Sequence, residues 1–123
     1  MNEINIKEIV EKLIKTFLDA GKVSLELREK GLTKEIKSDN TPVTNGDFEV
    51  NKIISNKIKE LTPDIPIISE ESSDNKNLQN LKDFWLIDPI DGTHDYINNL
   101  QEFTINAGLI INKKPAAGIF KIL

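Results

Sequence analysis

An apolar run that ends in two closely spaced carboxylates is the feature that most constrains the fold of this chain. Residues 85–87 read Trp-Leu-Ile, which is typical of a buried strand, and Asp88 and Asp91 follow it. Pro89 and Gly92 favour a turn, so we expect both carboxylates to leave the edge of a sheet and converge. Two carboxylates held close together repel each other unless a cation lies between them, and a divalent cation that prefers oxygen ligands suits this position.

The next residues point to a second ligand. Gly92 and Thr93 are expected to open a helix, whose first N–H groups suit a bound phosphate. The pattern therefore favours a metal site beside a phosphate site. The alternative is a solvated turn, because Asp-Pro and Asp-Gly pairs are ordinary turn formers.

Composition excludes several classes of function. The chain has 123 residues, enough for one domain with a modest core. Its 20 acidic and 16 basic side chains give a net charge of -4, which argues against general nucleic-acid binding. It has no cysteine, so disulfides and thiolate metal sites are excluded. Because no long apolar segment or signal-peptide pattern is present, we expect a soluble, cytoplasmic protein with no membrane partner.

Two segments have the apolar spacing of helices. Between residues 6 and 18 apolar side chains recur every three or four positions, and the pattern extends past Gly21. A second helix is expected to begin near Thr44, with Asp47 in the position of a capping-box acid, and to end before Pro63. The apolar stripe of this second helix consists of Val50, Ile53, Ile54, Ile58 and Leu61.

Strand patterns dominate the second half of the chain. Turns are expected at residues 39–42 and 112–115, and a polar, acidic loop at residues 69–79. The predicted strands cover residues 33–38, 65–68, 84–87, 103–111 and 116–123. Helices early and strands late indicate an α+β fold, with two helices packed on a largely antiparallel sheet.

The end of the chain has the pattern of an unfinished strand. Residues 118–123 alternate like the middle of a strand, and no turn or polar tail follows them. A fold that stops there leaves an open sheet edge, which proteins normally cover or charge. We therefore expect a truncated part of a longer domain. The alternative is that this strand pairs with a second copy in a homodimer.

Further carboxylates stand where strands end or helices begin. Glu70 and Glu71 directly follow a predicted strand, as Asp88 does. If the two strands are neighbours, Glu70 lies with Asp88 and Asp91 at one edge of the sheet. Taken singly, the Glu pair could be a solvated loop, and Asp47 could be a residue favoured by the helix dipole. Their combined order is more specific than any of them alone.

That order resembles the inositol monophosphatase superfamily of magnesium-dependent, lithium-sensitive phosphatases. The superfamily has an aspartate, a Glu-Glu pair, a D-P-[I/L]-D-G-[S/T] element and a distal Trp-Asp element. The first three appear here as Asp47, Glu70-Glu71 and residues 88–93, and the resemblance runs from about residue 20 to the end. The distal Trp-Asp element, which supplies a further metal ligand in the superfamily, is absent from this sequence.

Two segments are most similar to one branch of the superfamily, the 3'(2'),5'-bisphosphate nucleotidases, which dephosphorylate 3'-phosphoadenosine 5'-phosphate. These segments are residues 38–44 and 101–106. The chain departs from this branch after D-G-T, where the branch often has Lys-Glu-Phe and this chain has His94-Asp95-Tyr96. His94 is either a contact for substrate phosphate when protonated or an ordinary surface histidine.

The resemblance implies a fold, a metal and its ligands. The fold is the N-terminal part of a sugar-phosphatase-like α/β layered fold. Residues 1–123 would be its metal- and phosphate-binding part, and its C-terminal part would be absent. The implied cofactor is Mg²⁺, ligated by Glu70, Asp88, Asp91 and the main-chain carbonyl of Ile90.

The resemblance also implies catalytic residues, namely Glu70, Thr93 and Asp47. Thr93 would orient a metal-activated water together with Glu70 for in-line attack on phosphorus, and Asp47 would support the Thr93 hydroxyl. Backbone N–H groups of Gly92 and Thr93 would hold the phosphate oxygens.

The sequence therefore predicts a Mg²⁺-dependent phosphomonoesterase that acts on small phosphorylated substrates, with bisphosphate nucleotides ahead of inositol phosphates. Inositol monophosphatase activity is one alternative, and a catalytically incomplete fragment that folds and self-associates is another. A regulatory magnesium or calcium binder fits less well, because the carboxylates do not follow the spacing of an EF-hand loop.

Overall fold

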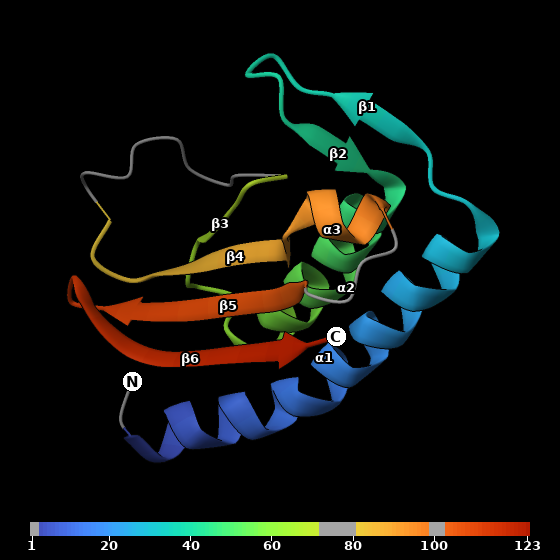
Figure 1. The fold of residues 1–123 in the computed structure, drawn as a ribbon. Coiled ribbons are helices and arrows are strands. Elements are labelled where there is room, and N and C mark those ends of the chain that lie inside the picture. The colour runs from blue at the N-terminus through green and yellow to red at the C-terminus, as the bar shows by residue number, and fades with distance from the viewer. Residues whose placement is uncertain (1–2, 72–80, 99–102) are drawn as a thin grey trace.

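Two long helices and a four-stranded sheet form the framework of the computed structural model, which describes residues 3–71, 81–98 and 103–123 (Figure 1). The helices in these residues are α1 (Glu3–Lys30), α2 (Asn45–Leu61) and α3 (Thr93–Ile97). The strands are β1 (Lys34–Ile36), β2 (Pro42–Thr44), β3 (Ile67–Ser69), β4 (Phe84–Asp91), β5 (Thr104–Ile111) and β6 (Lys114–Ile122).

The larger sheet has the strand order β3-β4-β5-β6 and is antiparallel except between β3 and β4. In the parallel pair, Ser69 lies beside Ile87. Glu70 and Asp88, the next residues in each segment, therefore both lie where the pairing of β3 with β4 ends. The two strands are thus neighbours, which is the condition under which the sequence placed Glu70 with Asp88 and Asp91. The smaller sheet is the antiparallel pair β1 and β2.

Helices α1 and α2 cover one face of the larger sheet, as Figure 1 shows. Together with the inner face of the sheet they form one core of Ile9, Leu13, Phe17, Val50, Ile54, Ile58, Ile67, Trp85, Ile87, Ile105 and Leu109. The indole N–H of Trp85 donates to Thr62 Oγ1 over 3.1 Å, so the polar atom of this buried ring has a partner. On the opposite face of the sheet the side chains of Leu86, Phe120 and Ile122 are exposed.

The predicted start and end of the second helix are confirmed. Thr44 is the N-cap of α2, and a full capping box links it to Asp47. The Thr44 side chain accepts from the Asp47 N–H, and the Asp47 side chain accepts from the Thr44 N–H. At the other end the Thr62 N–H donates to the Ile58 carbonyl over 2.7 Å, and Pro63 follows.

Strand β4 is longer than the sequence predicted. The expected turn after residue 87 was wrong, because the strand continues through Asp88 to Asp91. Asp88 pairs with Asn106 and Asp91 with Thr104, so residues 88–91 of β4 lie opposite residues 104–106 of β5. This irregularity places one extra residue in β4, as in a β-bulge, and accommodates Pro89, which has no N–H to donate to a neighbouring strand.

Other boundaries differ less. β1 covers only part of the expected strand 33–38, and β3 begins two residues later than expected. The hairpin turn at 112–115 is shorter than predicted, because only Asn112 and Lys113 have positive φ, 51° and 63°, which suits a two-residue type I′ turn. Most of the predicted loop 69–79, and residues 101 and 102 of the nucleotidase-like segment, lie outside the described residues. None of the described helices is long and apolar enough to span a membrane.

Candidate metal centre

A cleft of about 570 Å³ opens at the edge of the sheet where β3 and β4 end. It is lined by Lys37, Asp39, Thr41, Pro42, Glu70, Glu71, Asp88, Ile90, Asp91, Gly92, Thr93 and His94. A larger hollow of about 750 Å³ lies between α1, β1 and α3, with Leu25, Arg28 and Ile97 among its lining residues. We place the candidate site in the smaller cleft, because the carboxylates gather there.

Asp88 is the most perturbed carboxylate in the cleft. Its Oδ1 atom is buried and has no hydrogen-bond partner among the described residues. Burial raises the pKa of Asp88, and the negative charges of Glu70, Asp91, Asp47 and Glu71 raise it further, to about 6. A cation beside Asp88 would remove both penalties, since it would supply the missing partner and offset the repulsion.

The carboxylates are neighbours, but as they stand they do not form a closed ligand shell. Within residues 3–71, 81–98 and 103–123, no group of three or more His, Cys, Asp and Glu side chains is placed to hold a metal ion. Like charges favour separation of these groups, and a bound cation would draw them together. The donor set itself fits a hard divalent cation, because it consists of oxygen atoms and includes the Asp88 oxygen that lacks a partner among the residues the structure describes.

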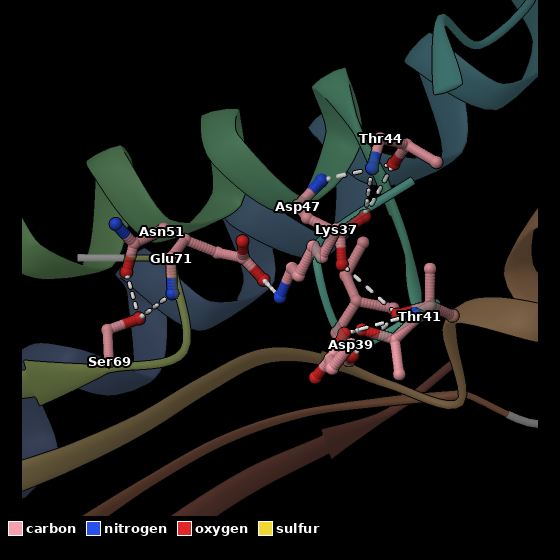
Figure 2. A network of polar contacts seen from close by, with 10 residues as sticks. Lys37, Asp39, Thr41, Thr44, Asp47, Asn51, Ser69 and Glu71 are labelled. Atoms are coloured by element: carbon pink, nitrogen blue, oxygen red, sulfur yellow. Dashed lines mark hydrogen bonds and ion pairs between the residues drawn. The ribbon is translucent and has the colours of Figure 1, made fainter. Parts of the chain in front are cut away.

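Glu71 is held by a lysine from the β1–β2 hairpin. Lys37 Nζ lies 3.3 Å from Glu71 Oε1, and the side chains are 28% and 3% exposed (Figure 2). Burial raises the pKa of Glu71 and outweighs the opposite effect of the Lys37 charge. The ion pair therefore engages Glu71 and places a positive charge at the rim of the cleft.

The end of β3 is tied to α2 by a buried polar chain, also drawn in Figure 2. Ser69 Oγ donates to Asn51 Oδ1 over 2.6 Å and accepts from the Glu71 N–H over 3.3 Å. Because all these groups are at least partly buried, the bonds fix the backbone just after the strand. This backbone carries Glu70 into the cleft.

Asp47 joins the start of α2 to the start of α3. Its Oδ2 atom accepts from the Thr44 N–H and hydroxyl over 2.8 and 2.6 Å, and its Oδ1 atom accepts from the Thr93 hydroxyl over 3.1 Å. The Thr93 hydroxyl also lies 3.2 Å from the Ile90 carbonyl oxygen. Its single hydrogen is therefore directed to these acceptors, which leaves Thr93 Oγ1 as an acceptor for another donor.

Gly92 makes the turn that brings Thr93 into the cleft. Its φ of 93° and ψ of 40° lie in the left-handed region, where glycine is favoured. Its carbonyl accepts from the Tyr96 N–H over 3.0 Å in the first turn of α3. His94 follows at the mouth of the cleft, with a side chain that is 80% exposed and an Nδ1 atom 3.4 Å from Asp95 Oδ1.

The structure thus brings the predicted site residues to one place. Glu70, Asp88, Ile90, Asp91, Gly92 and Thr93 line the cleft. Asp47 is 2% exposed and reaches the cleft through Thr93. The roles that the sequence suggested for these residues stay predictions.

Comparison with known proteins agrees with this geometry. The sequence profile of the inositol monophosphatase family matches residues 5–121, nearly the whole chain. The chain belongs to the inositol monophosphatase family. It is 35% identical over 116 residues to the 3'(2'),5'-bisphosphate nucleotidase CysQ of Buchnera aphidicola. That match covers 92% of this chain and 44% of CysQ.

Solved structures of the inositol monophosphatase family share the fold. The chain is similar to the Thermotoga maritima IMPase, with a TM-score of 0.79 and 27% identity, covering 90% of this chain and 42% of that one. It is also similar in fold to an IMPase/NADP phosphatase complexed with Mg²⁺ and phosphate, with a TM-score of 0.74 and 24% identity, covering 89% and 42%. The chain thus spans less than half the length of these relatives and matches their N-terminal part.

Several residues around the cleft of this family member were missed by sequence reasoning. Lys37 was given no role, and its partner Glu71 is 34 positions away, so no local pattern could link them. Asn51 and Ser69 are likewise joined across 18 positions. A local signal did exist at Asp39, whose Oδ1 accepts from the Thr41 N–H two residues on, as in an Asx-turn.

Proposed function

We propose that this chain carries the metal- and phosphate-binding part of a Mg²⁺-dependent phosphomonoesterase. We further propose that residues 1–123 form the N-terminal part of an inositol monophosphatase-like domain. The observation that carries the proposal is the buried Oδ1 atom of Asp88, which has no hydrogen-bond partner within the described part of the chain. Other carboxylates surround Asp88, and the Thr93–Asp47 hydrogen bond belongs to the same site. Family membership supports it, as does a fold neighbour described as complexed with Mg²⁺ and phosphate.

The residues that would hold Mg²⁺ are Glu70, Asp88, Asp91 and the carbonyl of Ile90. All four line the cleft, and they offer the oxygen ligands that Mg²⁺ prefers. When bound, the cation lowers the pKa of a coordinated water and offsets negative charge on a phosphate ester.

The chain's own residues would orient the reacting groups. The Thr93 hydroxyl directs its hydrogen toward Asp47 and the Ile90 carbonyl, so Thr93 Oγ1 can accept a hydrogen bond from a water molecule. Glu70 would accept a second hydrogen bond from that water and remove its proton during attack on phosphorus. The bond from phosphorus to the ester oxygen would break as the new bond forms, and the departing alcohol would take up a proton from solvent. The N–H groups of Gly92 and Thr93 would donate to the phosphate oxygens as negative charge builds on them.

For the substrate we propose a 3'(2'),5'-bisphosphate nucleotide such as 3'-phosphoadenosine 5'-phosphate. Similarity to relatives named as bisphosphate nucleotidases supports this choice. The second candidate is an inositol phosphate, because the fold neighbours include an IMPase at 27% identity. A cytoplasmic location and lithium sensitivity also stay predictions of the sequence.

The test is phosphate release from each of these substrates by the 123-residue chain, with and without Mg²⁺. Asp88→Asn should abolish release, whereas the matched change Asp64→Asn, at an exposed turn residue outside the cleft, should preserve it. The faster substrate identifies the branch. Absence of release from both substrates would refute enzymatic activity of this chain and favour the reading of an incomplete, self-associating fragment. Calorimetric titration with Mg²⁺ tests the metal site separately.

A further inference from the structure

Tyr96 is a fully buried residue that contacts three other parts of the fold. Its hydroxyl donates to the Ser24 carbonyl of α1 over 2.7 Å. Its ring packs edge-to-face on Phe103, with centroids 4.8 Å apart and planes at 61°. The Arg28 guanidinium lies 5.6 Å from the centre of the Tyr96 ring and 5.3 Å from that of Phe103. Tyr96 therefore holds α3 against α1 and the start of β5.

The fourth contact is with Gly46 in the first turn of α2, and it leaves no room for a side chain. A Cβ atom at Gly46 would overlap the Tyr96 hydroxyl and would lie 2.7 and 2.8 Å from ring atoms Cε2 and Cζ. Such distances are far below van der Waals contact. The backbone of Gly46 is helical, so its conformation does not require glycine. The requirement is the close approach of the ring.

This contact lies directly behind the candidate site. Gly46 immediately precedes Asp47, and Tyr96 follows Thr93 by about one helical turn in α3. The Tyr96 N–H donates to the Gly92 carbonyl over 3.0 Å, so the backbone at Tyr96 is bonded directly to the glycine turn. The ring thus sets how far the helix that carries Thr93 stands from the helix that carries Asp47.

We propose that Tyr96, seated against Gly46, is a positioning residue that holds the Thr93 hydroxyl at hydrogen-bond distance from Asp47. This inference rests on the proposed function, because it gives the Thr93–Asp47 pair its task of orienting a water. A Cβ at Gly46 pushes the ring outward and α3 with it. Displacement of catalytic groups by about 1 Å can cost about 100-fold in rate.

The variants test whether the contact between the Tyr96 ring and Gly46, and not a general loss of stability, affects the site. Gly46→Ala inserts the methyl group behind Asp47. Gly118→Ala is the matched control, because within residues 3–71, 81–98 and 103–123 a Cβ there meets only the Ala107 carbonyl oxygen, at 4.0 Å. Tyr96→Phe keeps the ring but removes the hydroxyl, and with it both the bond to Ser24 and the atom nearest to Gly46. The double variant Gly46→Ala/Tyr96→Leu replaces the aromatic ring with a shorter side chain, which leaves space for the new methyl group.

The first readout does not depend on activity. In ¹H–¹⁵N spectra of the folded chain, Gly46→Ala should shift the amide resonances of Asp47, Gly92 and Thr93, and Gly118→Ala should leave them in place. The unfolding free energies of Gly46→Ala and Tyr96→Leu should be non-additive in the double variant. The proposal would be overturned if the site amide resonances of folded Gly46→Ala did not shift, or if the changes in unfolding free energy were additive.

The second readout is the separate effect of each variant on kcat and on KM for phosphate release. Gly46→Ala should lower kcat about 100-fold with little change in KM, and Tyr96→Phe should lower it less. If Gly46→Ala does not fold, the test is made with Tyr96→Leu alone. This variant removes the ring contact, and the proposal requires it to shift the same amide resonances. A wild-type chain that releases no phosphate refutes the activity alone, since the amide shifts still test the role of Tyr96.

Discussion

Replacing Asp88 with asparagine should stabilise the metal-free protein and weaken its response to Mg²⁺. The folded chain raises the pKa of Asp88 from 3.8 to about 6, because the carboxylate is buried and surrounded by other negative charges. A difference of about two pKa units, at 1.36 kcal/mol each, corresponds to about 3 kcal/mol. Asp88 is only half-buried, so solvent screening reduces this to about 1–2 kcal/mol.

The sign follows from proton binding. Between pH 3.8 and about 6 the unfolded chain releases the Asp88 proton and the folded chain retains it. The stability of the metal-free protein therefore falls as the pH rises through this range, and it stays lower above it. Asparagine has nearly the same shape and no charge, so the variant should lose this contribution to the pH dependence.

The assay is urea unfolding at pH 5 and pH 8, each with a chelator and with excess Mg²⁺. At pH 8 without metal, Asp88→Asn should be more stable than the wild type by about 1–2 kcal/mol. Mg²⁺ at about 100 times its Kd should stabilise the wild type by about 2.7 kcal/mol and the variant by much less. Asp64→Asn should behave like the wild type. If Asp88→Asn is less stable than the wild type at pH 8 with chelator, the account of Asp88 is wrong.

Three further changes test other contacts of the site. Lys37→Met leaves the buried Glu71 carboxylate without its cation and should lower the free energy of unfolding in urea by about 1–2 kcal/mol. This is less than the loss of about 3–5 kcal/mol that is typical of a fully buried ion pair. The loss should be larger at high pH, where Glu71 is ionised. Thr44→Val removes a hydroxyl that bonds Asp47 and should cost about 1–2 kcal/mol in thermal unfolding, whereas Thr44→Ser should restore most of it. Thr93→Val should reduce phosphate release about 100-fold while Thr93→Ser stays within a few-fold, and equal activity of the two would contradict a role for the hydroxyl.

The parts of the fold that depend on local sequence could be predicted. The capping box joins Thr44 to Asp47, three positions apart, and its signal is complete in the sequence. The apolar stripe of α2 fixes which face is buried, and Val50, Ile54 and Ile58 are fully buried as expected. The position of Glu70 and Asp88 directly after short apolar strands could also be predicted, whereas the parallel pairing of those strands was only a condition of that reasoning.

The remaining features depend on contacts between distant segments. The irregularity in β4 is visible only once Asp88 and Asp91 are paired with β5, so a turn was the reasonable expectation from Pro89 alone. β1 and β2 are only three residues each, and their pairing sets the position of Lys37. The fit of Tyr96 against Gly46 likewise appears only in three dimensions.

The contacts that build the site join residues far apart in the sequence, so the site forms only when the chain has folded completely. In the hairpin of β5 and β6, Ile111 pairs with Lys114, only three positions away. The bond from Thr93 to Asp47 spans 46 positions, and that from Tyr96 to Ser24 spans 72. Closing long loops costs chain entropy before such contacts contribute, so the hairpin is expected early in folding and the cleft late. Ion binding at this cleft would then report that the last tertiary contacts to form are in place.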